Sequence, residues 1–456
     1  MQFATNLATL NQLYPNFMKK SLTALVAALF LSSAVSAQKV EFEEFTMDNG
    51  LHVILHQDKS APVVVTSVLY HVGSKDENPE RTGFAHFFEH LLFEGTENIP
   101  RGEWFKMVTS NGGHNNANTT EDRTYYYEVF PSNNLELSLW MESERMLQPV
   151  INQEGVDTQN EVVKEEKRLR VDNQPYGNFI AAVKENLFTK HPYRWAPIGS
   201  MEHLDAATLE EFYDFFRTYY VPNNAVLVVA GDIDYKETKA LVEKYFSPIK
   251  KGPEVSKVNV KEDPITTEIK ASFEDPNIQL PMYVTAYRLP AVTHEDSYAL
   301  DLLIAYLTGG KSAPMYKKVV DEKKTAMELM AFTHPYLVED YRMTMFAAIP
   351  TPGTTREQIQ VDIDNEIAKV QKELISERDY QKLQNTIENA YVNQNSNLET
   401  LAENLATYHT IYKDANLINT EIEKYRAVTR EQIKEVANKY LQSNSRLILD
   451  YVPAGE

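Results

Sequence analysis

The five residues His86-Phe87-Phe88-Glu89-His90 carry the strongest chemical signal in this 456-residue chain. Positions i, i+3 and i+4 are neighbours on an α-helix, so one helical face would present two imidazoles and a carboxylate. The two histidines can bind one metal ion while Glu89 lies beside it. The order H-x-x-E-H is the inverse of the commoner H-E-x-x-H metal-binding motif. The alternative is a helix that carries two histidines and binds no metal.

A third ligand is required, because a catalytic zinc ion usually has three protein ligands and one open position for water. The candidate segment is residues 160–170, for which we predict a charged helix with an apolar stripe at Val162, Val163 and Leu169. Taken alone, its carboxylates would indicate a solvated helix face, as such charge runs usually do. The charge pattern of this segment alone does not distinguish a metal-binding carboxylate from a solvated one.

After residue 40, the chain contains a series of short motifs. They are Val72-Gly73-Ser74, Gly83-Phe84-Ala85, Phe93-Glu94-Gly95-Thr96, Gly112-Gly113, Thr124-Tyr125-Tyr126, His191-Pro192-Tyr193, Pro197-Ile198-Gly199 and Tyr220-Val221-Pro222-Asn223-Asn224. In these motifs the chain resembles the family of inverted zinc peptidases that includes pitrilysin, insulin-degrading enzyme and mitochondrial processing peptidase, in its short bacterial form. The resemblance implies two homologous α+β units, each an antiparallel sheet with helices, which together form half of a clamshell-like peptidase.

The resemblance implies one Zn²⁺ per chain, bound by His86, His90 and Glu166, with Glu89 as the general base. Glu166 follows His90 by the family's spacing of 76 positions (166 − 90). Glu165 is the competing ligand, since one residue turns a side chain by about 100° around a helix. Manganese or cobalt could replace zinc in such a site.

The family often has a second glutamate, seven residues before the ligand, which assists as a proton relay. Here that position is Gln159, which can hold a hydrogen bond but cannot carry a proton. The auxiliary relay is therefore in doubt. The main chemistry is unaffected: zinc activates water and polarises a carbonyl, and Glu89 transfers the proton to the leaving amine. The expected product is a hydrolysed peptide bond.

Residues 113–119 resemble the family's edge strand, which binds an extended peptide by strand addition. That mode uses main-chain hydrogen bonds and so demands little of the substrate sequence. We predict substrate-binding roles for Asn116 and Ala117 and no zinc-binding role for His114. The alternative is a plain turn, since Asn, Gly and Thr clusters are usually loops.

The N-terminal region predicts export. Lys19-Lys20, the apolar run 22–31 and Val35-Ser36-Ala37 match a secretory signal, with Met18 as the expected start and cleavage after Ala37. The apolar run is too short to span a membrane. The chain has no cysteine, which fits an exported protein, and we expect a periplasmic or secreted location. The mature formal charge is −20 − 2 = −22, which excludes nucleic-acid binding through a basic surface.

The remaining length of about 420 residues predicts two domains. We place the zinc-bearing unit at residues 38–250, a linker at 251–263 and a second unit, without metal, at 264–456; residues 1–37 are the upstream stretch and signal. An internal repeat supports two units, because residues 208–228 and 429–449 share a predicted helix, a Tyr, an Asn and a following apolar strand. The copies are offset by 221 positions (429 − 208).

The second unit has lost two kinds of functional residue. Alignment of the units puts Leu300, Leu303 and Ile304 at the positions of His86, Glu89 and His90, which predicts a core helix. The resemblance also implies an Arg and a Tyr, seven residues apart, that support catalysis in single-chain family members. Those two positions are Val320 and Met327, unless the segment is misaligned.

From this loss we predict a zinc-dependent endopeptidase subunit that cleaves extended, unstructured peptides. A homologous partner without H-x-x-E-H would supply the Arg and Tyr in a heterodimer. One alternative is a catalytically weak scaffold or peptide-binding member of the same family. Another is a homodimeric processing peptidase with sequence-specific cleavage.

Overall fold

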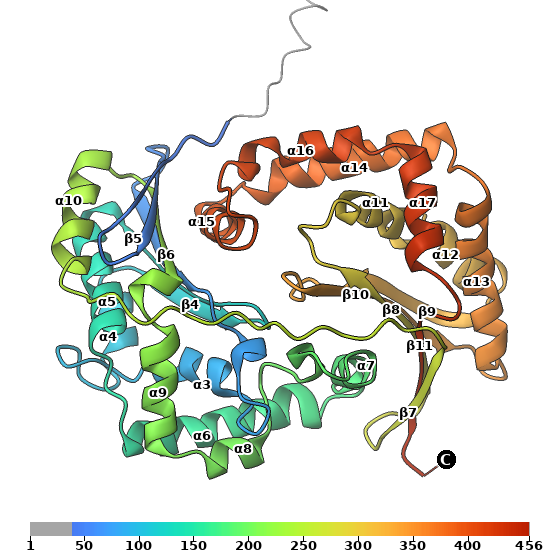
Figure 1. Cartoon of the computed structure of the whole chain (residues 1–456), viewed down its shortest axis with the longest axis horizontal. Helices are drawn as coiled ribbons and strands as arrows, with labels where there is room; N and C mark the ends of the chain where they lie inside the picture. Colours follow the sequence, from blue (N-terminus) through green and yellow to red (C-terminus); the bar gives the residue numbers. More distant parts are fainter. Residues whose placement is uncertain (1–38, 456) are drawn as a thin grey trace, which may run out of the picture. The chain divides into compact units, whose positions relative to one another are not determined.

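The computed structural model describes residues 39–455, and the predicted signal segment lies outside them. The chain from Glu41 onward forms one compact unit that contains two β-sheets. Residues 250–266, which join the regions of the two sheets, form neither helix nor strand (Figure 1). The predicted domain boundaries remain a prediction, because the two regions share packing that is described below.

The first sheet has the strand order β1-β2-β6-β3-β5-β4, so β4 is an edge strand. Its strands are β1 (Glu43–Thr46), β2 (His52–Gln57), β3 (Val63–Tyr70), β4 (His114–Thr119), β5 (Thr124–Pro131) and β6 (Ala225–Gly231). The second sheet has the order β7-β11-β8-β10-β9. Its strands are β7 (Ile269–Asp275), β8 (Met282–Pro290), β9 (Ala326–Thr333), β10 (Tyr341–Pro350) and β11 (Leu447–Pro453).

The sheets are not purely antiparallel, which corrects one detail of the sequence prediction. In the first sheet β2 and β6 are parallel, and in the second β7 and β11 are parallel. Every other neighbouring pair is antiparallel. A parallel pair requires a long crossover, and in both sheets the paired strands are separated by most of the unit's helices. The fold class, two mixed α/β units, is confirmed.

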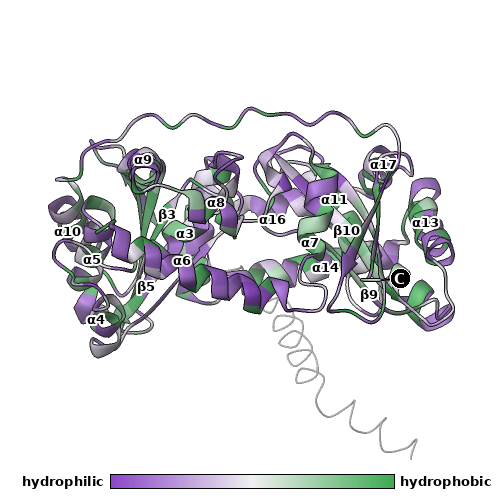
Figure 2. Cartoon of the chain, turned by 90° about the horizontal axis from the view of Figure 1, so that it is seen from below, coloured by the Kyte–Doolittle hydropathy of each residue, from purple (hydrophilic) through white to green (hydrophobic). Residues whose placement is uncertain are grey.

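Helices cover both sheets. Those before residue 250 are α3 (Phe84–Leu91), α4 (Trp104–Ser110), α5 (Leu135–Leu147), α6 (Gln153–Lys167), α7 (Phe179–Leu187), α8 (Met201–Ala206), α9 (Leu209–Tyr219) and α10 (Tyr235–Phe246). Those after it are α11 (Ser297–Thr308), α12 (Pro314–Tyr316), α13 (Arg356–Lys372), α14 (Glu377–Gln394), α15 (Leu398–Thr407), α16 (Leu417–Ala427) and α17 (Arg430–Tyr440). The strands are largely hydrophobic and the outer helices α6 and α13 largely hydrophilic (Figure 2).

The internal repeat is visible in the structure. Helices α9 and α17 each begin after a threonine N-cap, Thr208 and Thr429, whose hydroxyl accepts the N–H of the third helical residue. Each helix has 11 residues and precedes a buried strand, β6 or β11. Because capping and hydrophobic pattern are local properties, the sequence predicted this repeat correctly.

Two equivalent helices are exchanged between the sheets. Helix α7 packs on β7, β8 and β11 of the second sheet, and α15 packs on β3, β5 and β6 of the first (Figure 1). The repeat offset of 221 maps residues 179–187 onto 400–408, which largely coincide with α15. Each half therefore covers the sheet of the other with the same element. This exchange explains why the chain from Glu41 onward does not divide into two compact units.

A buried polar cluster adds to the contact between the halves. The Glu339 carboxylate accepts hydrogen bonds from His71 Nε2 and Lys75 Nζ, both at 2.7 Å. Lys75 also pairs with Asp122 at 2.9 Å, and Asp122 accepts the N–H groups of Val338 and Glu339. Burial alone would raise the pKa of Glu339, but the donors His71 and Lys75 outweigh it and lower that pKa well below its usual range.

We predict that Glu339→Gln lowers the free energy of unfolding by about 2 kcal/mol at pH 7. A carboxyl group whose folded pKa is lowered stabilises the protein above its unfolded pKa of about 4.3, and this stabilisation is lost as pH falls toward the folded pKa. The difference between wild type and variant should therefore shrink below pH 4. Urea unfolding at pH 7 and pH 3.5 measures it, and a difference independent of pH would contradict the prediction.

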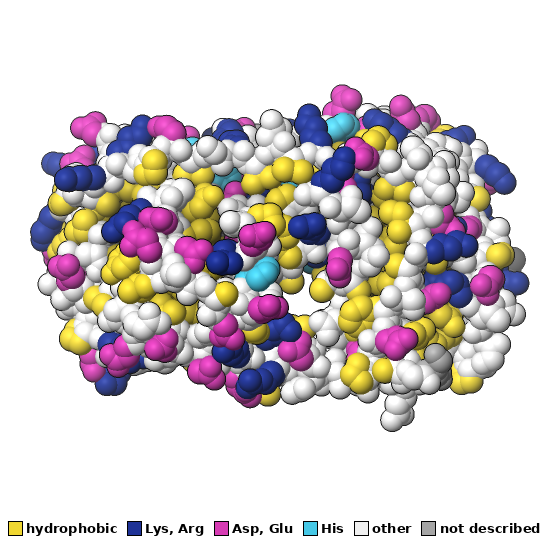
Figure 3. Space-filling model, turned by 60° about the horizontal axis from the view of Figure 1, so that its bottom comes forward, with side chains coloured by type: hydrophobic (Ala, Val, Ile, Leu, Met, Phe, Trp, Pro, Cys, Tyr) yellow, Lys and Arg dark blue, Asp and Glu magenta, His cyan; other side chains and the backbone are white. Residues whose placement is uncertain are grey.

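Among the described residues, no helix combines the length and the apolar character needed to cross a bilayer. Figure 3 shows one face of the molecule, where acidic and basic side chains are interspersed and form no continuous basic patch.

Candidate active site

Helix α3 carries the H-x-x-E-H motif and is held at its N-terminus by Glu77. The N-cap is Gly83, with φ 98°, and it has no side chain to cap the helix. A Cβ at this position would lie 3.0 Å from the Ile198 carbonyl oxygen, so both the backbone conformation and the space require glycine. The buried Glu77 carboxyl accepts the N–H groups of Gly83 and Ala85, each at 2.9 Å. These bonds replace a side-chain N-cap.

The C-terminal end of α3 is held by Arg145. Its Nη1 donates to the carbonyl oxygen of Leu92, the C-cap residue, at 3.1 Å. A positive charge there also interacts favourably with the helix dipole. The guanidinium is fully buried over the rings of Phe93, Trp104 and Tyr126. It pairs with two buried carboxylates, Glu128 at 3.4 Å and Glu142 at 3.2 Å.

We predict that Arg145→Met lowers the free energy of unfolding by about 3–5 kcal/mol, because it leaves Glu128 and Glu142, whose pKa values burial raises, without the buried cation that opposes this rise. The matched control is Arg217→Met, since Arg217 is 63% exposed and its ion pairs are 3.5 and 3.8 Å long. The control should change stability by less than about 1 kcal/mol. Chemical denaturation measures both variants, and equal effects would refute the assigned role of Arg145.

The structure brings His86, His90 and Glu166 together. Glu166 Oε2 lies 3.6 Å from His86 Nε2 and 3.1 Å from His90 Nε2, and one donor atom from each residue lies within 4.8 Å of the others. A tetrahedral zinc ion with bonds of 2.0–2.1 Å separates its ligand atoms by about 3.4 Å. His86 Nδ1 and Glu166 Oε2 are buried and form no hydrogen bond. The donor set and its spacing fit one divalent metal ion.

The protonation state of His86 suits a ligand. Burial, with a smaller contribution from His90, lowers the pKa of His86 to about 4. The ring is therefore neutral near pH 7, and neutral imidazole is the form that coordinates a metal.

Glu165 and Glu166 point in different directions from α6. Glu166 is 15% exposed and reaches the histidines, and its other oxygen pairs with Arg170 at 2.7 Å. Glu165 is 55% exposed and pairs with Arg168 at 3.1 Å. The 100° rotation per residue places only one of the two carboxylates at the histidines, and it is Glu166.

Glu89 lies in a cleft of about 660 Å³ with His90 and Glu166. Thr119, on the edge strand β4, donates its hydroxyl to Glu89 Oε2 at 2.7 Å. Burial raises the pKa of Glu89, and the bond from Thr119 opposes that rise. The Glu89 carboxylate is thus held beside the three candidate metal ligands, and one of its oxygens accepts a hydrogen bond from Thr119.

The predicted substrate residues line the same cleft. Asn116 and Ala117 lie on β4, whose outer edge has no neighbouring strand in the sheet. Asn115 also lines the cleft, and its amide nitrogen is buried without a hydrogen-bond partner. His114 lies away from the metal cluster and contacts Glu399 of α15 at 3.1 Å. Gln159, at the relay position, donates to Glu94 at 2.5 Å.

Sequence reasoning missed two neighbours of the cluster. Thr119 holds Glu89, and Arg170 pairs with Glu166. Arg170 stands four residues after Glu166 in the charged segment, and this i,i+4 spacing was a usable signal. Thr119 shares a strand face with Ala117, but no local pattern connects it to Glu89, which is 30 positions earlier.

The second half has no equivalent site at the aligned positions. Leu300, Leu303 and Ile304 are buried on α11, which confirms the predicted core helix. Val320 is half-buried and packs on the hydrophobic core that includes Leu300 and Leu303, and Met327 is 46% exposed on β9. Neither side chain can donate a hydrogen bond.

Two similar sheets and an H-x-x-E-H helix define the class of inverted metallopeptidase folds. The family model described as Insulinase (Peptidase family M16) matches residues 52–195, which contain His86, Glu89, His90 and Glu166. The model described as Peptidase M16 inactive domain matches residues 206–387. The chain belongs to peptidase family M16, as the sequence motifs predicted.

Several relatives are named as zinc proteases. Zinc protease PqqE of Helicobacter pylori is 29% identical over 436 residues, which cover 94% of this chain and 97% of the relative. The crystal structure of a protease from Helicobacter pylori matches with a TM-score of 0.85 and 29% identity, over 91% of this chain and 100% of that one. The periplasmic protease PqqL of Escherichia coli shares the fold, with a TM-score of 0.74 and 21% identity. That match covers 91% of this chain and 48% of PqqL.

Proposed function

We propose that this chain is a zinc-dependent endopeptidase that hydrolyses extended, unstructured peptides. The observation that carries the proposal is the convergence of His86, His90 and Glu166 beside Glu89 in a cleft edged by β4. The similarity to proteins named as zinc proteases supports zinc, one ion per chain. His86, His90 and Glu166 would hold it, and Glu89 would remain free for proton transfer.

A zinc ion bound there would act as a Lewis acid on the scissile carbonyl and lower the pKa of a water molecule. Glu89, fixed by Thr119, takes the proton of the attacking water and passes it to the leaving amine. The unpaired edge of β4 holds the peptide through main-chain hydrogen bonds. Asn116 and Ala117 are the positions at which we place this contact.

Part of the cleft wall beside the candidate metal ligands is apolar. Phe93, Phe105, Val162 and Leu169 line it, and the last three are between 43% and 56% exposed. Exposed apolar side chains in a cleft favour an apolar group of a ligand. We therefore propose a preference for large apolar side chains next to the cleaved bond.

We further propose that the enzyme works as the zinc-bearing subunit of a heterodimer. The chain spans about half of PqqL, so a second homologous chain would be needed to match that length. Val320 and Met327 stand where an Arg and a Tyr would assist catalysis, and the partner would supply both. The location we propose is the periplasm or the exterior, as the N-terminal sequence predicts.

The test is hydrolysis of a quenched fluorescent, unstructured peptide by the zinc-loaded protein, alone and mixed with a homologous partner that carries the Arg and Tyr. Activity that requires the partner would support the heterodimer, and full activity of the chain alone would overturn that part. Bound zinc without hydrolysis in either mixture would instead favour the scaffold or peptide-binding alternative. Cleavage of a single precursor, and of no unrelated peptide, would indicate a processing peptidase.

A further inference from the structure

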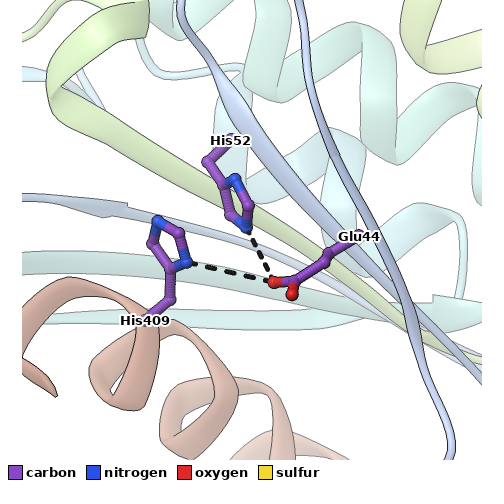
Figure 4. A group of neighbouring side chains, drawn as sticks. All are labelled: Glu44, His52 and His409. Carbon is purple, nitrogen blue, oxygen red and sulfur yellow. Dashed lines mark hydrogen bonds and ion pairs between the residues drawn. The ribbon is translucent and has the colours of Figure 1, made fainter. Parts of the chain in front are cut away.

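A second group of metal-binding side chains lies away from the candidate active site. It consists of Glu44 on β1, His52 on β2 and His409 on the π-helical segment η7 (Tyr408–Tyr412) (Figure 4). Glu44 Oε2 lies 3.1 Å from His52 Nε2 and 4.0 Å from His409 Nδ1. One donor atom from each residue lies within 4.8 Å of the others.

This spacing is close to that of the active-site cluster. The corresponding carboxylate-to-imidazole distances there are 3.1 and 3.6 Å. Both clusters have the same donor set, two imidazoles and one carboxylate, which suits zinc and other divalent ions of the first transition series. The two clusters use different residues on different elements, so they are separate sites.

A second hydrogen bond orients the His52 ring. The other ring nitrogen of His52, Nδ1, hydrogen-bonds Thr46 Oγ1 at 3.1 Å, which fixes the ring with Nε2 toward Glu44. Metal-binding histidines usually have such a partner on the second nitrogen. Glu44 is 44% exposed, which leaves the group open to ions from solvent.

The position of the group gives it a structural consequence. Glu44 and His52 come from the edge of the first sheet, and His409 follows α15, the helix that the second half packs on that sheet. Other polar contacts of α15 lie toward the opposite edge of this sheet, where Glu399 pairs with His114 and Glu403 with Arg123. A metal ion bound by Glu44, His52 and His409 would cross-link the exchanged helix to the sheet.

We propose that Glu44, His52 and His409 form a second, structural binding site for a divalent cation of the zinc type, which fastens α15 to the first sheet. The rings of His52 and His409 are stacked, with centroids 3.5 Å apart and planes 12° from parallel. Two nearly parallel rings cannot direct their lone pairs at one point, so binding tilts one ring away from the other. Water or a second carboxylate oxygen completes the coordination.

The experiment uses the full-length protein with His86→Ala and His90→Ala, which removes both imidazoles of the active-site group and leaves only Glu166 there. Zinc is titrated into the metal-free variant in competition with a chromophoric chelator, and cobalt absorption reports the ligand geometry. We expect one zinc ion per chain and a rise in Tm on binding. Adding His409→Ala should weaken zinc binding by at least about tenfold and abolish the rise in Tm.

The matched control is His114→Ala in the same background. His114 also contacts a glutamate of α15 at 3.1 Å, but no second histidine lies in that pair. The His114→Ala substitution should leave zinc binding unchanged. Where His409→Ala fails to fold, the more exposed Glu44→Gln provides the same test.

Failure to bind zinc in the background variant would overturn the proposal, and so would zinc binding that survives both His409→Ala and Glu44→Gln. In either case the group is a hydrogen-bonded contact between the halves. Because the background variant lacks the active-site histidines, the outcome is independent of whether the wild-type protein hydrolyses peptides.

Discussion

Glu89→Gln is expected to lower kcat for peptide hydrolysis by about 10²–10⁴-fold while zinc remains bound. Gln has nearly the same shape as Glu but cannot accept and release a proton at neutral pH. The three residues that would hold the metal, His86, His90 and Glu166, are unchanged. The measurement is the steady-state rate with a fluorescent peptide, together with the zinc content of the purified variant.

Thr119→Val separates positioning from proton transfer. The variant keeps the Glu89 carboxylate but removes the hydroxyl that donates to it at 2.7 Å. We expect a smaller loss of kcat than for Glu89→Gln and a changed pH–rate profile, since the hydrogen bond opposes the rise in the pKa of Glu89. Full activity of Glu89→Gln at normal zinc content would refute Glu89 as the general base.

Glu166→Gln is expected to weaken zinc binding by about 100-fold or more and to abolish hydrolysis at limiting zinc. The substitution removes the anionic ligand of the cluster, and it leaves Arg170 without its partner. Loss of a residue that only orients a metal ligand already costs about 10–100-fold in affinity, and loss of a ligand costs more. Zinc affinity, measured by chelator competition, is the primary readout.

Glu165→Gln is the matched control, because it makes the same chemical change one position earlier on α6. Glu165 pairs with Arg168 on the exposed surface, so zinc affinity and kcat should stay within about twofold of wild type. The reverse result, with Glu165→Gln losing zinc and Glu166→Gln retaining it, would assign the third ligand to Glu165.

The chain's local patterns were sufficient for the motif helix and the repeat. His86, Glu89 and His90 lie on one helix, where a fixed rotation per residue sets their relation before any packing is known. The repeated helix–strand units likewise follow from a threonine cap, a helical hydrophobic period and an apolar strand. The edge strand was foreseen only through the family resemblance, since its composition also fits a loop.

Tertiary structure decided the contacts that no local period encodes. The choice of Glu166 over Glu165 depends on how α6 lies against α3, which places one of two adjacent carboxylates at the histidines. The exchange of α7 and α15 depends on which sheet face is left uncovered when both units have formed. Glu44 and His409 are 365 positions apart in sequence (409 − 44), and they come together because α15 packs on the first sheet. The sequence alone determined what each element could bind; packing between distant elements determined which side chains meet, because that packing reflects the burial of whole helix and sheet faces.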